Sequence, residues 1–110
     1  MLKNRIIGYK LDKNGQPKRV YSFLELANWL SRNNEKRRIG LTEVGKFTVS
    51  TVFLMYDHSC GFGKPVLFET MIFNTITGKF KAYQERYCTK KEAIKGHRKA
   101  IKMLKSKLKK

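Results

Sequence analysis

The sequence predicts a single small α+β domain, in which two amphipathic helices pack on an antiparallel sheet of about four or five strands with a central hairpin. Three patterns lead to this fold class. Residues 47–56 and 65–73 are rich in β-branched and aromatic side chains and flank a glycine-containing turn, which is typical of a hairpin. Capping boxes of the form Ser/Thr-x-x-Glu precede two stretches with helical spacing of apolar residues. The length of 110 residues fits one domain, residues 1–110.

The N-terminal part is predicted to be a hairpin followed by a helix. Residues 6–11 and 18–21 form the strands, and the Asn-Gly pair at 14–15 forms the turn because both residue types tolerate positive φ. The helix begins after Ser22, whose hydroxyl can accept a hydrogen bond from the backbone of Glu25. Its predicted apolar stripe follows the i, i+3, i+4, i+7 spacing and consists of Phe23, Leu26, Ala27 and Leu30.

The middle of the chain is predicted to supply the sheet. A basic run at 36–38 leads into a short strand or loop, and the two apolar strands at 47–56 and 65–73 then pair as the central hairpin. A Thr-Gly pair at 77–78 marks the next turn, and residues 80–87 form a more polar strand.

The last helix is predicted over about residues 89–108 and opens with a capping box between Thr89 and Glu92. Its predicted apolar face consists of Ile94, Ile101, Leu104 and Leu108, with Ala93 and Ala100 beside them. His97 falls in the middle of that face. From Lys90 to Lys110 there are ten basic residues and one acidic residue, so the helix is basic wherever it is not apolar.

Charge is the strongest functional signal. The chain has 25 Lys and Arg residues against 8 Asp and Glu, for a net charge of +17. Such a charge causes self-repulsion unless an anion is nearby, so we expect an anionic partner, with nucleic acid first. The alternative is a solvated surface that reflects only a lysine-rich composition.

The composition also sets expectations about the compartment. No apolar window approaches a membrane span or a signal peptide, so we expect a cytoplasmic protein without a membrane partner. Cys60 and Cys88 form no C-x-x-C pair and are expected to be reduced. No cofactor and no metal site are predicted.

The residues expected to contact the anion come from the basic run, the central loop and the last helix: Lys36, Arg37, Arg38, Lys64, Lys91, Lys95, Arg98, Lys99, Lys102 and Lys105. The loop at 59–65 has two glycines and a lysine, and such backbone can cradle phosphate. It lacks the spacing of a P-loop, however, and an ordinary hairpin loop is the simpler interpretation.

Four ionisable residues stand in apolar surroundings, namely Asp57, His58, Glu69 and His97. Buried ionisable groups need partners, so these residues are candidates to be each other's partners. Depending on the register of the central hairpin, Glu69 shares a face with Asp57 or with His58. A His/Asp/Glu cluster could act in acid–base catalysis or bind a divalent metal. The alternative is a structural or ligand-gripping polar network.

The run from Val49 to Leu54, then Asp57 and His58, then residues 67–71 resembles the core motif of a family of short phage, prophage and bacterial proteins. The pattern Arg-Tyr-x-Thr-x-x-Glu-Ala-x-x-Gly-His at 86–97 resembles the C-terminal motif of that family. The family has no assigned activity, so the resemblance implies a viral or mobile-element origin. It also implies that the four ionisable residues share a site.

These observations favour a phage-type accessory protein that binds nucleic acid through its basic C-terminal helix, without enzyme activity. One alternative is a counter-defence protein that sequesters a nucleotide signal or inhibits a nucleic-acid-bound host complex. Another is a small metal-dependent or His/Glu-dependent hydrolase.

Overall fold

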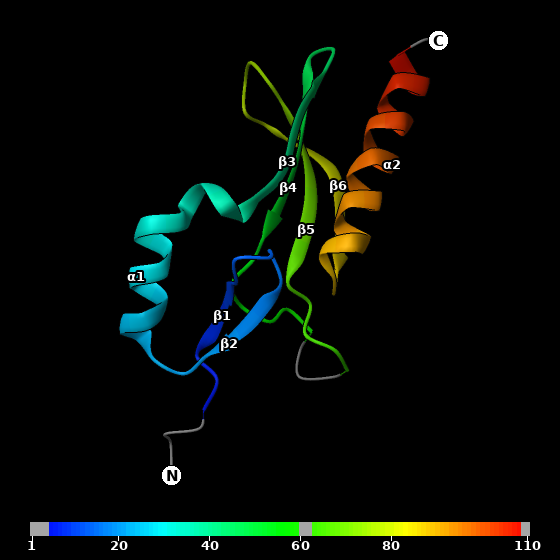
Figure 1. Cartoon of the computed structure of the whole chain (residues 1–110). Helices are drawn as coiled ribbons and strands as arrows, with labels where there is room; N and C mark the ends of the chain where they lie inside the picture. Colours follow the sequence, from blue (N-terminus) through cyan, green and yellow to red (C-terminus); the bar gives the residue numbers. More distant parts are fainter. Residues whose placement is uncertain (1–4, 60–62, 109–110) are drawn as a thin grey trace.

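The computed structural model describes residues 5–59 and 63–108 and confirms the α+β fold class. The elements follow one another in the order β1 (Gly8–Leu11), β2 (Pro17–Val20), α1 (Phe23–Asn33), the 3-10 helix η1 (Asn34–Arg37), β3 (Arg38–Val44), β4 (Phe47–Phe53), β5 (Phe68–Asn74), β6 (Phe80–Tyr87) and α2 (Lys90–Leu108). Strands β3 to β6 form a four-stranded antiparallel sheet in chain order, and β1 and β2 form a separate hairpin. Figure 1 shows α2 along one side of the large sheet and α1 beside the hairpin.

The register of β4 against β5 decides which side chains face α2. Because successive side chains of a strand alternate between faces, one face of this pair collects a fully buried set: Val49, Thr51, Phe53, Phe68, Thr70 and Ile72. Val52 and Glu69 pair with each other and point to the other face. Glu69 therefore lies on the opposite side of the sheet from α2.

The central strands are shorter than predicted. Strand β4 ends at Phe53 because Met55 has a φ of 67°, in the left-handed region that interrupts a strand. Strand β5 begins only at Phe68. The connection between them is longer than the predicted loop, yet backbone hydrogen bonds still tie it together, from Leu54 N to Leu67 O at 2.7 Å and from His58 N to Val66 O at 3.0 Å.

The predicted β1–β2 hairpin is present, but of the Asn-Gly pair only Gly15 has a positive φ, of +78°, and the turn is closed by a hydrogen bond from Gly15 N to Asp12 O. A carboxylate oxygen of Asp12 fixes the turn by accepting hydrogen bonds from the backbone of Asn14 and Gln16, both at 2.9 Å. The hairpin is joined to the rest of the fold by a hydrogen bond from Tyr9 N to Met55 O of 2.7 Å.

Helix α1 has the predicted cap, since Ser22 Oγ accepts from Glu25 N at 3.4 Å. The predicted apolar stripe is confirmed only in part: Leu26 is buried and Leu30 packs partly buried against the core, whereas Ala27 is exposed and Phe23 is 72% exposed. The helix lies mainly on β1 and β2 and not on the large sheet. Gly8 permits this placement, since a Cβ there would lie 2.9 Å from the Leu26 side chain. Trp29 makes the link to the large sheet by an edge contact with Phe53 at 6.0 Å between ring centroids.

Helix α2 also has its predicted capping box, in which Glu92 N donates to Thr89 Oγ1 and Thr89 N donates to Glu92 Oε1, both at 3.1 Å. The residues it buries are Ala93, Gly96, His97, Ala100 and Leu104. The predicted burial of Leu108 is wrong, since it is 48% exposed. Small residues make up the buried stripe because the helix lies close to the sheet. At Gly96, an added Cβ would overlap the hydroxyl of Tyr87.

The core has two clusters. One joins the hairpin, α1 and the Phe53–Phe68 end of the sheet, and the other joins α2 to Val49 and Ile72. In the part of the chain that the structure describes, no helix has the length and apolar character needed to cross a membrane.

Candidate anion-binding surfaces

His97 is held inside a hydrogen-bonded network between α2 and the sheet. Its Nε2 lies 2.9 Å from Thr42 Oγ1 in β3, and its Nδ1 lies 2.8 Å from Thr51 Oγ1 in β4. Thr51 Oγ1 in turn lies 2.6 Å from Thr70 Oγ1, to which Tyr87 OH donates at 3.2 Å. We call these five residues the Thr–His network.

A neutral imidazole satisfies this network completely. If Tyr87 donates to Thr70, Thr70 to Thr51 and Thr51 to His97 Nδ1, then the Nε2–H of His97 donates to Thr42. Burial lowers the pKa of His97, which favours the same neutral form. Both ring nitrogens are therefore occupied by structural partners, and His97 serves the packing of α2.

Glu69 has partners on the other face of the sheet. Its Oε2 accepts from Gln84 Nε2 at 2.7 Å and from Arg86 Nε at 2.8 Å, both in β6. This ion pair compensates a carboxylate that is only 8% exposed. Glu69 and His97 cannot be partners, because the sheet lies between them.

Asp57 and His58 organise the connection between β4 and β5. Asp57 Oδ1 accepts from Ser59 N at 2.8 Å and from Val66 N at 2.9 Å. Burial opposes the charge on this carboxylate, but the hydrogen bonds from Val66 and Ser59 outweigh it and lower the pKa of Asp57. His58 Nδ1 lies 2.8 Å from the carbonyl oxygen of Tyr56.

The expectation that the four ionisable residues are each other's partners is therefore wrong for Glu69 and His97, while Asp57 and His58 stay together in their loop. Among the residues that the structure describes, no three His, Cys, Asp or Glu side chains gather closely enough to hold a metal ion. Cys88 is a free thiol. The predicted phosphate cradle in the loop falls largely on Cys60, Gly61 and Phe62, which lie outside the described residues.

Helix α2 carries a basic stripe along its outer face. Its members are exposed and recur every three or four residues: Lys91, Lys95, Arg98, Lys102 and Lys105. On a helical wheel this spacing places them opposite the stripe that packs on the sheet. Across residues 5–59 and 63–108, none of them has a carboxylate within salt-bridge distance. The stripe is thus a row of uncompensated positive charges facing away from the sheet.

The other predicted basic residues are dispersed. Arg37 donates from Nε to the carbonyl oxygen of Phe53 at 3.3 Å and so stabilises the junction of η1 with the sheet. Lys99 is exposed on α2 beside the basic stripe, and Lys64 is exposed in the connection after Gly63. Lys36 and Arg38 lie in a pocket whose other basic residues were not predicted from the sequence.

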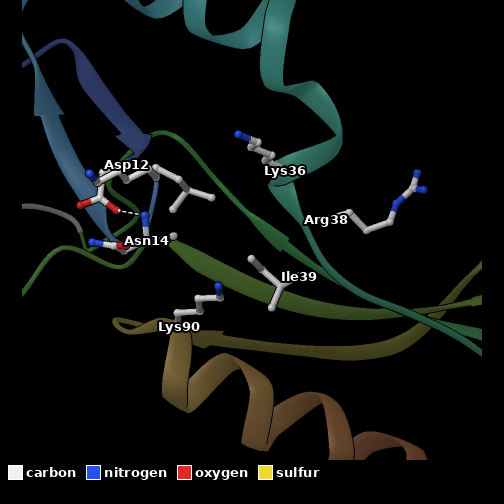
Figure 2. A pocket seen from close by; sticks show the side chains of 9 residues that line it. Asp12, Asn14, Lys36, Arg38, Ile39 and Lys90 are labelled. Atoms are coloured by element: carbon white, nitrogen blue, oxygen red, sulfur yellow. Dashed lines mark hydrogen bonds between the residues drawn. The ribbon is translucent and has the colours of Figure 1, made fainter.

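Those two residues line a pocket of about 310 Å³ where three segments meet: the β1–β2 turn, the junction of η1 with β3 and the start of α2. We call it the turn pocket, and its lining residues are Leu11, Asp12, Lys13, Asn14, Gly15, Lys36, Arg38, Ile39 and Lys90. In Figure 2, Lys36 and Lys90 lie on opposite sides of the pocket, Asn14 and Ile39 lie on its other two sides, and the guanidinium of Arg38 points outward.

Lys13 and Lys90 are the pocket cations that the sequence analysis missed. They are 77 positions apart in the chain, so no local motif connects them. Their proximity follows from the packing of the hairpin turn against α2. Gly15 makes this possible, since a Cβ there would lie 2.5 Å from Lys90 Nζ.

Comparison with family models, curated proteins and solved structures gave no match for this chain. The resemblance to short phage and prophage proteins stays a prediction.

Proposed function

We propose that this protein binds nucleic acid along the outer face of α2. The observation that carries the proposal is the basic stripe, whose five cations are exposed and have no carboxylate partner in the described chain. Like charges at helical spacings of three and four residues repel one another. A polyanion laid along the helix relieves that repulsion.

The dimensions of the stripe favour a polymer over a small anion. From Lys91 to Lys105 the helix rises by about 21 Å, at about 1.5 Å per residue. Duplex DNA carries one phosphate charge for each ~1.7 Å of its axis, so the stripe can meet several phosphates at once. Contacts of this kind follow the backbone and carry no sequence information, so we expect binding with little sequence preference.

A membrane surface suits the stripe less well. A helix that lies on a bilayer inserts an apolar face into it. The apolar face of α2 is already packed on the sheet through Ala93, Ala100 and Leu104. The phage-type setting rests on the motif resemblance alone, and the binding proposal does not depend on it.

The test is binding of fluorescently labelled single- and double-stranded oligonucleotides across a salt series. Each phosphate neutralised on duplex DNA adds about 0.9 to the slope of log affinity against log salt. Lys95→Gln/Arg98→Gln/Lys102→Gln should therefore lower the slope by about 2.7. The matched control Arg19→Gln/Lys46→Gln/Lys79→Gln removes the same charge from exposed positions outside the basic stripe and should leave the slope nearly unchanged.

Two results would overturn the proposal. One is the absence of binding by the unaltered protein at about 0.05 M salt, where the Debye length exceeds 10 Å and surface charges act strongly. The other is an equal loss in both triple variants, which would assign binding to net charge and not to the stripe.

A further inference from the structure

The turn pocket is separate from the basic stripe. Lys90 lies about 100° around the helix from Lys91, so it points sideways toward the hairpin turn while the stripe points away from the sheet. A polymer along the stripe therefore leaves the pocket unoccupied. What the pocket binds is a question independent of the proposed function.

The pocket is strongly cationic. Four basic side chains line it, and among the described lining residues Asp12 supplies the single carboxylate. That carboxylate is engaged by the turn, because Oδ1 accepts two backbone hydrogen bonds and Oδ2 lies 3.8 Å from Lys18 Nζ. The hydrogen bond from Gln16 is the main cause that lowers the pKa of Asp12, so the carboxylate stays ionised as part of the turn. Asp12 interacts with Lys18 and Lys13, and it forms no ion pair with Lys36 or Lys90.

Lys90 lies in the wall of the pocket, where the start of α2 packs against the hairpin turn. Its side chain is half-buried against Gly15, and it has no ion pair in the part of the chain that is described. A half-buried ammonium without a counter-ion gains from an anion more than an exposed one does, because it is less screened by water. Lys36 lies on the opposite side of the pocket (Figure 2).

The size and the lining of the turn pocket restrict the kind of ligand that it can bind. A volume of about 310 Å³ is at the lower end of the range for small-molecule sites. Leu11 and Ile39 add apolar wall, and the Asn14 side chain adds a hydrogen-bonding group. A phosphate monoester carries about 1.5–2 negative charges at neutral pH, more than a diester inside a strand, and so suits a pocket lined by several cations. Within the described residues, the guanidinium of Arg38 has no hydrogen bond or ion pair, so it can turn inward to a phosphate.

We propose that the turn pocket binds a phosphate monoester, with Lys36 and Lys90 holding the phosphate and Leu11 and Ile39 contacting the attached nucleoside. This chemistry occurs on a free nucleotide and on the phosphorylated end of a strand. The same site serves both, and the two sources are separated by experiment.

The first arm compares adenosine 5′-monophosphate with adenosine by calorimetry on the full chain. The monophosphate should bind at least tenfold more tightly than the nucleoside, and Lys36→Gln should remove most of that difference. Lys36 is exposed, so the variant should fold, and Lys36→Gln/Lys90→Gln should abolish the preference. Arg19→Gln/Lys79→Gln is the control of equal charge.

The second arm compares short oligonucleotides that differ only in a 5′-phosphate or a 5′-hydroxyl. If strand ends are the ligand, the phosphorylated form should bind several-fold more tightly, and the gain should vanish in the pocket variants. The stripe variant should lose affinity for both oligonucleotides but keep the preference for the 5′-phosphate. Failure of the proposed function and failure of the pocket proposal therefore give different results.

A phosphate-dependent gain in the first arm alone identifies a free nucleotide as the source, and a gain in the second arm alone identifies a strand end. Absence of the gain in both arms would overturn the proposal. So would its retention in Lys36→Gln/Lys90→Gln, or an equal loss in the charge control.

Discussion

Helices α1 and α2 both begin with a capping box and both have apolar residues at helical spacing, yet α2 buries five residues against the four-stranded sheet and α1 buries only Leu26. The difference comes from small residues. Gly96 and the alanines of α2 bring its axis close to the sheet, and Gly40 of β3 makes room for the His97 ring. The apolar side chains of α1 are larger and have only the narrow hairpin to cover.

Apolar residues at helical spacing therefore do not by themselves determine how firmly a helix is held. Helix α2 is fixed by close approach and by the Thr–His network, so its outer face can carry charge without losing its position. Helix α1 is fixed mainly by Leu26 and by the edge of Trp29, and we expect it to open locally at a lower free energy than α2.

Among the changes that test this difference between the helices, His97→Ala should have the largest effect on the free energy of unfolding. The change leaves a cavity and removes a hydrogen-bond partner from both Thr42 and Thr51, so the free energy of unfolding should fall by about 3 kcal/mol. Urea unfolding followed by circular dichroism measures it. His58→Ala is the matched control, since this histidine is exposed, its ring bonds to the carbonyl of Tyr56 in its own loop, and its loss should cost at most about 0.5 kcal/mol. Equal costs for the two histidines would contradict the structural role of His97.

Gly40→Ala should have the next largest effect. The new Cβ would lie 2.8 Å from His97 Nε2 and 2.9 Å from its neighbouring carbons, so the ring must move away from Thr42. We expect a loss of about 1–2 kcal/mol from overpacking. In the background of His97→Ala the same change should cost almost nothing, because the obstructing ring is gone. A double-mutant cycle that shows additivity would disprove the steric explanation.

Acidification should destabilise the protein through the same network. Because burial lowers the pKa of His97 below its ordinary value of 6.5, the unfolded chain takes up this proton at a higher pH than the folded protein. The contribution of His97 to stability is therefore complete above pH 6.5 and is lost as the pH falls from there toward the folded-state pKa. Asp12 and Asp57 have pKa values lowered from 3.8 and titrate below this range.

Unfolding free energies at several pH values between about 7.5 and 5 give the test. The protein and its His58→Ala variant should lose stability over this range, whereas His97→Ala should show a much smaller slope. The same slope in all three proteins would place the titration elsewhere.

The sequence was sufficient for the features that local chemistry decides. The β1–β2 hairpin, the N-cap of α1, the capping box of α2 and the paired strands β4 and β5 follow from residue type and spacing, and the structure confirms them. Features that depend on long-range packing could not be predicted in this way. The approach of Lys90 to Lys13 needs the hairpin turn to be placed against α2, and the separation of Glu69 from His97 needs the register of β4 and β5.

The smallest expected effect is that of Phe23→Ser in α1. Phe23 is 72% exposed, so its replacement should change the free energy of unfolding by at most about 0.5 kcal/mol. Leu26→Ala on the same helix should cost about 2–3 kcal/mol, because Leu26 is the buried contact with the hairpin. Urea unfolding at two protein concentrations measures both. A loss of more than about 1 kcal/mol for Phe23→Ser that grows with protein concentration would mean that a second copy of the chain covers the Phe23 face of α1 in solution. Helix α1 would then be held as firmly as α2, by a contact between two chains.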